Sequence, residues 1–383
     1  MAFSVRLLED YLEGQRQLKT PALSVGILAL GVLMGCLFSR RKAKEAAPRL
    51  PRGKVVDVHA LPAEHVTSLM ELYGEPPGEF LSGRDGITHF YYEAPSTSAW
   101  SMGSKQLAIL AHGIGTSHKV YDGVRTRLLA AGFRVLAYDF FGHGWSSKYE
   151  NVSIDAEVLV NQLKELADHV LKPSEAVDLF VGHSTGGIVG VLAAARLERS
   201  FRRLALISPA FWKVAPLTVK IGDVIPSLVY WVASIKALNL VPTAYLENMD
   251  NAFAHEGGKY FLPEIYERSK ANVRRMFELH PQILEAVIDV TKNILRADVL
   301  VEQLKEFRAL VGGQVQRQPP KIGLFWGSHD IVVPTEHGKD VLSWPGSSSC
   351  ATLKILDRLG HEAPVENASQ VAGELVKFVS ATR

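Results

Sequence analysis

Short apolar runs alternate with amphipathic stretches over most of the chain. Runs of strand length lie at 86–92, 107–111, 133–138, 177–181, 204–208, 322–326 and 353–356. Helical spacing of apolar residues follows several of them, for example at 187–199 and 367–379. This alternation predicts a mostly parallel sheet covered by helices on both faces. Because right-handed crossovers bring the carboxyl ends of parallel strands to one edge, we expect a functional site in the loops at that edge.

The alternation breaks between Pro209 and about Pro320, where more than 100 residues separate two predicted strands. The stretch 225–240 is strongly apolar, and 268–310 has helical spacing. We expect a helical cap over the site, in which part of the aromatic side chains line an apolar cavity. These aromatic residues are Phe211, Trp212, Tyr230, Trp231, Tyr245, Phe253, Tyr260, Phe261 and Phe277.

A further apolar run spans 22–38 and is followed by the basic cluster Arg40, Arg41, Lys42 and Lys44. Its length, about 17 residues, is near the lower limit for a helix that crosses a bilayer. The basic cluster lies after the run, whereas a cleavable signal peptide carries its charge before it. The pattern predicts an uncleaved single-pass membrane anchor, with the domain that follows it in the cytosol.

These features divide the chain into six segments. We predict an N-terminal segment 1–21, a transmembrane helix 22–38, a basic linker with a short helix 39–79, a first half of the core 80–209, a helical cap insertion 210–318 and a second half of the core 319–383.

Composition excludes several functional classes. With 42 basic and 40 acidic residues the net charge is +2, which provides no basis for binding nucleic acid. Thirteen histidines and two cysteines show no metal-ligand spacing, so we expect neither a metal nor a cofactor. Cys36 and Cys350 lie far apart in dissimilar segments and imply no disulfide. The oligomeric state is left open.

The sequence Gly182-His183-Ser184-Thr185-Gly186 directly follows one predicted strand and precedes a predicted helix. A serine on such a strand-to-helix turn has a strained backbone and an exposed hydroxyl, and the glycines avoid a steric clash in the tight bend. This context predicts Ser184 as a nucleophile. A serine needs a base to remove its proton and a third group to orient that base.

Two later strand ends supply these groups in the required chain order. Asp330 follows the strand at 322–326, and His361 follows the strand at 353–356. We predict Ser184, His361 and Asp330 as nucleophile, base and orienting acid. Asp357 is the alternative acid, while Asp139 lies before the serine and against the expected order.

The loop His112-Gly113-Ile114-Gly115 follows the strand at 107–111. Its glycines allow backbone amides to turn toward a ligand. We expect the amides of Ile114 and Thr185 to form an oxyanion hole, and His112 to brace the loop.

Five elements in this order resemble the α/β-hydrolase superfamily: His112-Gly113, the Asp139-to-Ser146 segment with glycines at 142 and 144, the serine turn, Asp330 and His361. The resemblance spans about residues 80 to 380 and is strongest to the esterase, lipase and monoglyceride-lipase-like branch. It implies an α/β-hydrolase fold. It also implies that the Asp139 segment lies near the pocket without taking part in catalysis. The chain lacks the His-Gly-Gly-Pro-Gly loop of proline iminopeptidases, which favours esters over peptides.

The expected function is hydrolysis of carboxylic esters through an acyl-enzyme on Ser184. The apolar cap and the predicted anchor favour lipid esters such as monoacylglycerols or lysophospholipids. Three alternatives stay open: an acyltransferase or thioesterase with the same triad, a carbon–carbon bond hydrolase, and a non-catalytic interaction protein on a hydrolase fold. The sequence does not define the acyl chain length or the head group.

Overall fold

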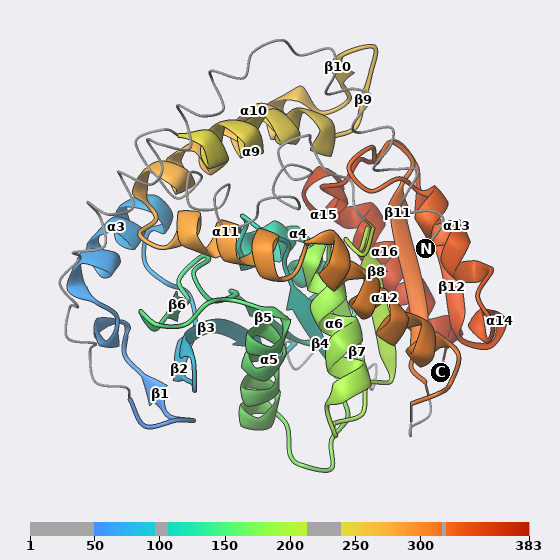
Figure 1. The fold of residues 1–383 in the computed structure, drawn as a ribbon, viewed down its shortest axis with the longest axis horizontal. Helices are drawn as coiled ribbons and strands as arrows, with labels where there is room; N and C mark the ends of the chain where they lie inside the picture. The colour runs from blue at the N-terminus through green and yellow to red at the C-terminus, as the bar shows by residue number, and fades with distance from the viewer. Residues whose placement is uncertain (1–49, 96–105, 213–238, 316–318, 383) are drawn as a thin grey trace, which may run out of the picture. The chain divides into compact units, whose positions relative to one another are not determined.

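A ten-stranded sheet lies at the centre of the computed structural model, which describes residues 50–95, 106–212, 239–315 and 319–382 (Figure 1). The strand order is β1-β2-β3-β5-β4-β7-β8-β11-β12, with β6 paired to β3. The strands are β1 (Val55–Val56), β2 (Glu79–Ser82), β3 (Gly86–Glu93), β4 (Leu107–Ala111), β5 (Arg134–Tyr138), β6 (Ser147–Lys148), β7 (Leu179–His183), β8 (Arg203–Ile207), β11 (Lys321–Gly327) and β12 (Ala351–Leu356).

The sheet is antiparallel at one edge and parallel over the rest. β1, β2, β3 and β6 pair in antiparallel fashion, and β3 joins β5 in the same way. From β5 to β12 all pairs are parallel. The predicted mostly parallel sheet is confirmed. Because β1 pairs with β2, the sheet includes residues from the segment 39–79, where the sequence indicated only a linker and a short helix.

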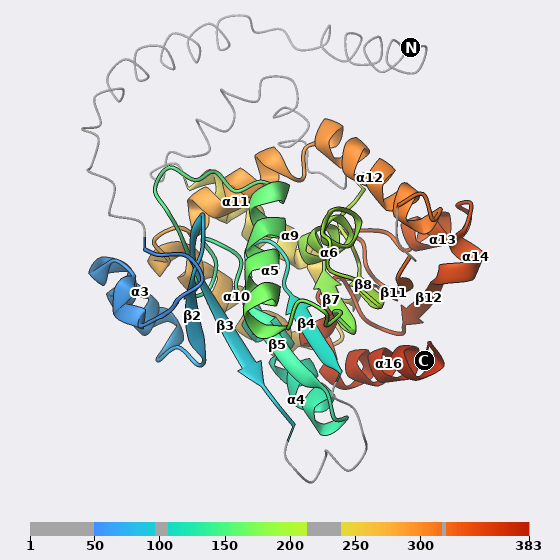
Figure 2. The same cartoon turned by 90° about the horizontal axis from the view of Figure 1, so that it is seen from below.

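Helices cover both faces of the sheet, as predicted. The helices of the described residues are α3 (Ala63–Tyr73), α4 (Asp122–Ala130), α5 (Ala156–Val170), α6 (Thr185–Arg196), α9 (Leu240–Ala252), α10 (Pro263–Leu279), α11 (Ile283–Asn293), α12 (Ala297–Val311), α13 (Glu336–Leu342), α14 (Ser347–Cys350), α15 (Ala363–Glu366) and α16 (Ala368–Ala381), with 3₁₀ turns η1 (Val58–Ala60) and η3 (His118–Tyr121). Figure 2 shows α5, α6 and α12 on one side of the strands and α4 and α16 on the other.

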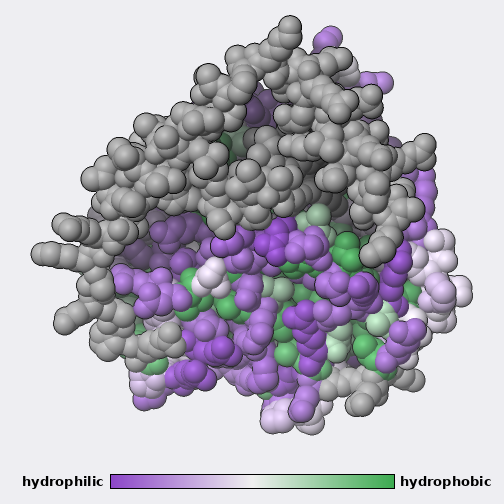
Figure 3. All heavy atoms as spheres, in the orientation of Figure 1, coloured by the Kyte–Doolittle hydropathy of each residue, from purple (hydrophilic) through white to green (hydrophobic). Residues whose placement is uncertain are grey.

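Alternate residues of each strand enter two separate cores, because successive side chains in a strand point to opposite faces. In β4, Leu107 and Ile109 face α5 and α6, while Ala108 and Leu110 face α4 and α16. Both faces are buried, so these strands are apolar throughout. In the part of the surface drawn in colour, Figure 3 shows mainly hydrophilic residues over the outer helices, as expected for amphipathic helices on a sheet.

Local signals define several helix starts. The Asp155 side chain accepts a hydrogen bond from the Val158 amide at the start of α5, and Asn367 does the same for Gln370 at the start of α16. Such caps satisfy amides that have no partner within the helix.

The segment 210–318 contains two kinds of helix. The helices α9, α10 and α11 share a core with Met249, Phe253, Tyr266, Met276 and Ile283, and they lie together in Figure 1 with the hairpin β9 (His255–Glu256) and β10 (Lys259–Tyr260). In contrast, α12 packs on α6, and its Phe307 and Leu310 belong to the core of the sheet. We refer to α9, α10 and α11 with the β9–β10 hairpin as the cap. The apolar stretch 225–240 falls almost entirely outside the described residues.

The predicted membrane anchor is not supported. Among the described residues, no helix is long and apolar enough to cross a bilayer. The apolar helix α6 has 12 residues, a length of ~18 Å against the ~30 Å of a hydrocarbon core. This finding contradicts the predicted localisation, a single-pass membrane protein with a cytosolic catalytic domain. For the part of the chain that the structure describes, that prediction is wrong. The proposed span 22–38 itself lies outside that part.

Candidate active site

Ser184 occupies a strained turn between β7 and α6. Its backbone angles are φ 52° and ψ −116°, a conformation that residues other than glycine rarely adopt. The Ser184 amide donates to the Ile207 carbonyl at 3.0 Å, which ties the turn to the neighbouring strand. A Cβ on Gly182 would lie 2.4 Å from the Gly186 carbonyl oxygen, and a Cβ on Gly186 would lie 2.2 Å from that of Ala111. Both glycines are therefore required by close backbone approach.

Asp330 and His361 meet at the ends of neighbouring parallel strands, β11 and β12. The His361 Nδ1–H donates to Asp330 Oδ2 at 3.0 Å. Asp330 Oδ1 accepts the amides of Val332 and Val333, so the carboxylate is held by its own loop. Both side chains are buried. Asp357, the alternative acid, is exposed. Of the two candidate acids, Asp330 is the one that contacts the imidazole.

Charge pairing alters the pKa of both groups. Burial by itself lowers the pKa of His361, but Asp330 and the nearby Glu362 more than offset it, so that the pKa is raised above its ordinary value. Burial raises the pKa of Asp330, but the adjacent His361 and further hydrogen bonds to the carboxylate, including that from the Val333 amide, together outweigh it, and the net pKa is below the usual range. The pair therefore stabilises an imidazolium beside an ionised carboxylate.

His183 connects the serine turn to the histidine loop. Its Nε2–H donates to the His361 carbonyl at 2.9 Å, and the two ring centroids are 5.0 Å apart. Burial lowers the pKa of His183 to about 3, so its ring is neutral. In the described residues no hydrogen bond joins the Ser184 hydroxyl to the His361 ring. The structure brings the serine and the histidine into one region through His183.

The loop after β4 lies against Ser184, since a Cβ on Gly113 would be 3.2 Å from Ser184 Cβ. His112 Nε2 accepts the Phe140 amide at 2.9 Å, and its Nδ1–H donates to the Gly113 carbonyl at 2.6 Å. Burial lowers the pKa of His112 to about 3, which keeps this neutral tautomer. His112 therefore braces the loop, as expected from the sequence.

The orientation of the Ile114 amide follows from these contacts. The Gly113 carbonyl is held by His112 and by the Thr116 hydroxyl at 3.0 Å. In a trans peptide the N–H of the next residue points the opposite way, so the Ile114 amide points away from His112. This amide has no hydrogen-bond partner among the described residues. Thr185 is the first residue of α6, where amides have no partner within the helix.

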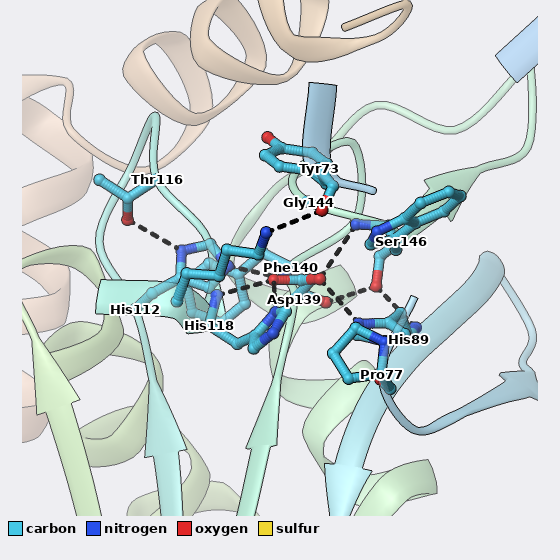
Figure 4. Close-up of polar contacts among 12 residues, drawn as sticks. Tyr73, Pro77, His89, His112, Thr116, His118, Asp139, Phe140, Gly144 and Ser146 are labelled. Carbon is cyan, nitrogen blue, oxygen red and sulfur yellow. Dashed lines mark hydrogen bonds and ion pairs between the residues drawn. The ribbon is translucent and has the colours of Figure 1, made fainter. Parts of the chain in front are cut away.

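A buried cluster anchors the end of this loop (Figure 4). Asp139 Oδ1 accepts the His118 amide and ring Nδ1–H at 2.7 and 3.0 Å, while Oδ2 accepts the His89 ring and the Trp145 amide at 2.9 and 3.0 Å. The other ring nitrogen of His89 donates to the Pro77 carbonyl at 2.5 Å. Two histidines and a carboxylate are residue types that ligate metals. Here each carboxylate oxygen already accepts two N–H groups, so hydrogen bonding accounts for the cluster.

Two further side chains approach the site, and the sequence predicted a contact there for neither of them; Tyr245 is one of the aromatic residues of the expected cap, whereas Glu366 has no signal in the sequence. Tyr245 of α9 donates to the Ile114 carbonyl. Glu366 of α15 accepts the Gly360 amide on one oxygen and the Ala254 amide on the other, both at 2.9 Å. The Ile114 carbonyl and the Ala254 amide lie 131 and 112 positions away from these side chains, and no local pattern encodes such partners.

Comparison with known proteins agrees with this geometry. The family model described as serine aminopeptidase, S33, matches residues 103–368, more than half of the chain. The chain belongs to this family. It is 29% identical to human monoglyceride lipase over 263 residues, which cover 67% of the chain and 75% of that enzyme. The rat monoglyceride lipase is 36% identical over 106 residues, but the match covers only 35% of its length.

Solved structures share the fold. An esterase from Thermogutta terrifontis superposes with a TM-score of 0.57 at 18% identity, covering 80% of this chain and 96% of the esterase. An α/β hydrolase named MGS-M2, from a deep-sea metagenome library, has a TM-score of 0.59 at 20% identity. The match covers 79% of this chain and 97% of that hydrolase. The predicted α/β-hydrolase fold is confirmed. The family match and the similarity to monoglyceride lipase support the predicted enzyme class, a serine hydrolase of carboxylic esters.

Proposed function

We propose that the protein hydrolyses lipid esters such as monoacylglycerols or lysophospholipids, with Ser184 as nucleophile, His361 as general base and Asp330 as the orienting acid. The observation that carries this proposal is the arrangement around the strained Ser184 turn. The turn packs against the loop whose Ile114 amide has no partner among the described residues, and His183 connects it to the His361–Asp330 pair. The apolar core of α9 to α11, which Ile114 and Val332 also contact, supports an apolar substrate. The similarity to monoglyceride lipases points the same way.

The proton positions suit this chemistry. Because His361 donates its Nδ1–H to Asp330, the neutral ring has its lone pair on Nε2. That nitrogen takes the proton of the Ser184 hydroxyl as the oxygen attacks the ester carbonyl. The amides of Ile114 and Thr185 donate to the oxyanion that forms. Each donor of this kind contributes about 3 kcal/mol in the transition state.

The intermediate then collapses. His361 gives its proton to the leaving alcohol, and the carbonyl carbon stays bonded to Ser184 as an acyl-enzyme. Water attacks this ester while His361 takes a proton from the water and returns it to Ser184, which releases the acid. Asp330 stabilises the imidazolium in both halves of the reaction.

The test combines covalent labelling with a substrate series. Wild type should react with a fluorophosphonate and hydrolyse p-nitrophenyl esters, with a preference for medium or long acyl chains. Ser184→Ala should lose labelling and reduce hydrolysis by up to about 10⁶-fold. Ser380→Ala is the matched control, because its hydroxyl contacts only its own helix, at the Val376 carbonyl.

Full labelling of Ser184→Ala would remove the basis of the assignment. A wide preference for acetyl esters would overturn the lipid substrate but keep the chemistry. Faster turnover of aminoacyl anilides than of every ester would favour a peptidase. Products formed with added alcohols separate hydrolysis from acyl transfer, and turnover of diketones rather than esters would indicate carbon–carbon bond cleavage.

A further inference from the structure

We propose that Tyr245 of α9 is a positioning residue for the oxyanion loop, so that the cap takes part in forming the oxyanion hole. This inference rests on the proposed function, because it assigns the Ile114 amide as an oxyanion donor. Nothing in the family match or in the proposed triad assigns a role to this tyrosine.

The contact is direct and comes from the cap. The Tyr245 hydroxyl donates to the Ile114 carbonyl at 2.7 Å, across 131 positions of the chain. The ring lies over the next residue, Gly115, where a Cβ would be 2.5 Å from ring atoms. The ring also packs against Phe277 of α10, with centroids 5.4 Å apart. The tyrosine is therefore held by the cap on one side and holds the loop on the other.

Two successive peptide groups of the loop are fixed in this way. His112 and Thr116 hold the carbonyl of Gly113, and this sets the direction of the Ile114 amide. Tyr245 holds the carbonyl of Ile114, and so fixes the peptide group that follows. Gly115 has a φ of +66°, in the region that favours glycine. A loop with this freedom needs contacts on both sides of Ile114 to keep one amide direction.

The hydroxyl is suited to a permanent donor role. Burial raises the pKa of Tyr245 above its ordinary value, and the nearby Glu362 adds to this effect, so the hydroxyl stays protonated over the working pH range. The Ile114 side chain also packs with the apolar core of α9 to α11. Apolar packing holds the cap against the loop but does not orient the peptide groups. The hydrogen bond from Tyr245 orients the Ile114 carbonyl.

The experiment removes only the hydroxyl. Tyr245→Phe in the full chain keeps the ring over Gly115 and against Phe277. We expect kcat for a p-nitrophenyl ester to fall roughly tenfold, less than the loss of a whole oxyanion donor, with KM changed less than about twofold. The matched control is Tyr266→Phe, which removes a cap hydroxyl bonded to Asp250 at 2.5 Å and should leave kcat nearly unchanged.

A second measurement separates positioning from a general effect on the fold. A trifluoromethyl ketone forms an anionic adduct on the nucleophile and so probes the oxyanion hole, whereas the product alcohol probes ground-state binding. Tyr245→Phe should lower the affinity for the ketone by the same factor as it lowers kcat/KM, and it should leave the affinity for the alcohol unchanged.

Three outcomes would overturn the inference. They are unchanged kinetics in Tyr245→Phe, equal losses in Tyr245→Phe and Tyr266→Phe, and a rise in KM with constant kcat. A failure of the proposed function looks different, because wild type would then lack esterase activity or Ser184→Ala would retain it.

Discussion

At the scale of single residues, the proposed chemistry depends on the protonation of His361. A base must be neutral to accept the serine proton, and Asp330 raises the pKa of the imidazole by stabilising its charged form. In the proposed mechanism, the acid that orients the ring therefore also raises the pH above which the ring can act as a base.

The pH profile should reveal this pairing. We expect kcat/KM to rise with pH and to reach half of its maximum above pH 6.5, the ordinary pKa of histidine. Asp330→Asn should move the rising limb of this pH profile to lower pH, because the imidazolium loses its counter-charge. It should also lower kcat by roughly 10⁴-fold.

Asp357→Asn is the control for this profile, since Asp357 is exposed. It should leave both the limb and the rate unchanged. A limb that stays in place in Asp330→Asn would show that a different group titrates.

At the scale of elements, the serine turn depends on how closely α6 approaches the ends of β4 and β7. The sequence predicted most of the central strands and α6 because their apolar runs are local signals. It did not predict β1, β2 or β6, which have two to four residues. Runs this short show no periodicity, and their strand geometry comes from pairing with neighbours.

Gly186→Ala tests the close approach of α6. The new Cβ would lie 2.2 Å from the Ala111 carbonyl oxygen, so we expect the free energy of unfolding to fall by about 3 kcal/mol. Esterase activity should fall with it, because Ala111 directly precedes the oxyanion loop.

Gly373→Ala in α16 is the matched exchange, since nothing lies within 4 Å of its Cβ. It should stabilise the protein by up to about 1 kcal/mol through helix propensity. Urea unfolding measures both variants, and equal effects would contradict the steric account.

At the scale of the whole molecule, the cap is joined to the sheet through buried hydrogen bonds at the site. Glu366 binds the Gly360 amide beside His361 and the Ala254 amide of the chain that leaves α9. A Cβ on Gly360 would lie 2.6 Å from the Ala254 nitrogen, which shows how closely the two segments pack. The cap and the histidine loop therefore share one buried carboxyl group.

This carboxyl group should make stability depend on pH. Burial raises the pKa of Glu366 from 4.5 to about 7. Because the pKa is raised in the folded state, protonated Glu366 contributes fully to the free energy of unfolding below pH 4.5. As the pH rises to about 7, this contribution, on the order of 3 kcal/mol, is lost.

Glu366→Gln cannot titrate, so the unfolding free energy of wild type should fall relative to this variant between pH 4.5 and 7. Glu278→Gln, on the exposed surface of α10, is the control and should follow wild type. Parallel curves for wild type and Glu366→Gln would contradict the raised pKa.

The sequence by itself determined the positions of the central strands along the chain, the glycine-rich turn at Ser184 and the loop at Ile114. These depend on apolar periodicity and on local backbone sterics, which are readable within a few residues. It left two acids open for His361. Only the tertiary structure decided that Asp330 contacts the ring, that Tyr245 and Glu366 join the cap to the site, and that β1 extends the sheet. Those contacts pair side chains or short strands with groups from tens of positions to just over a hundred positions away, and no local pattern specifies which distant group will be adjacent after folding.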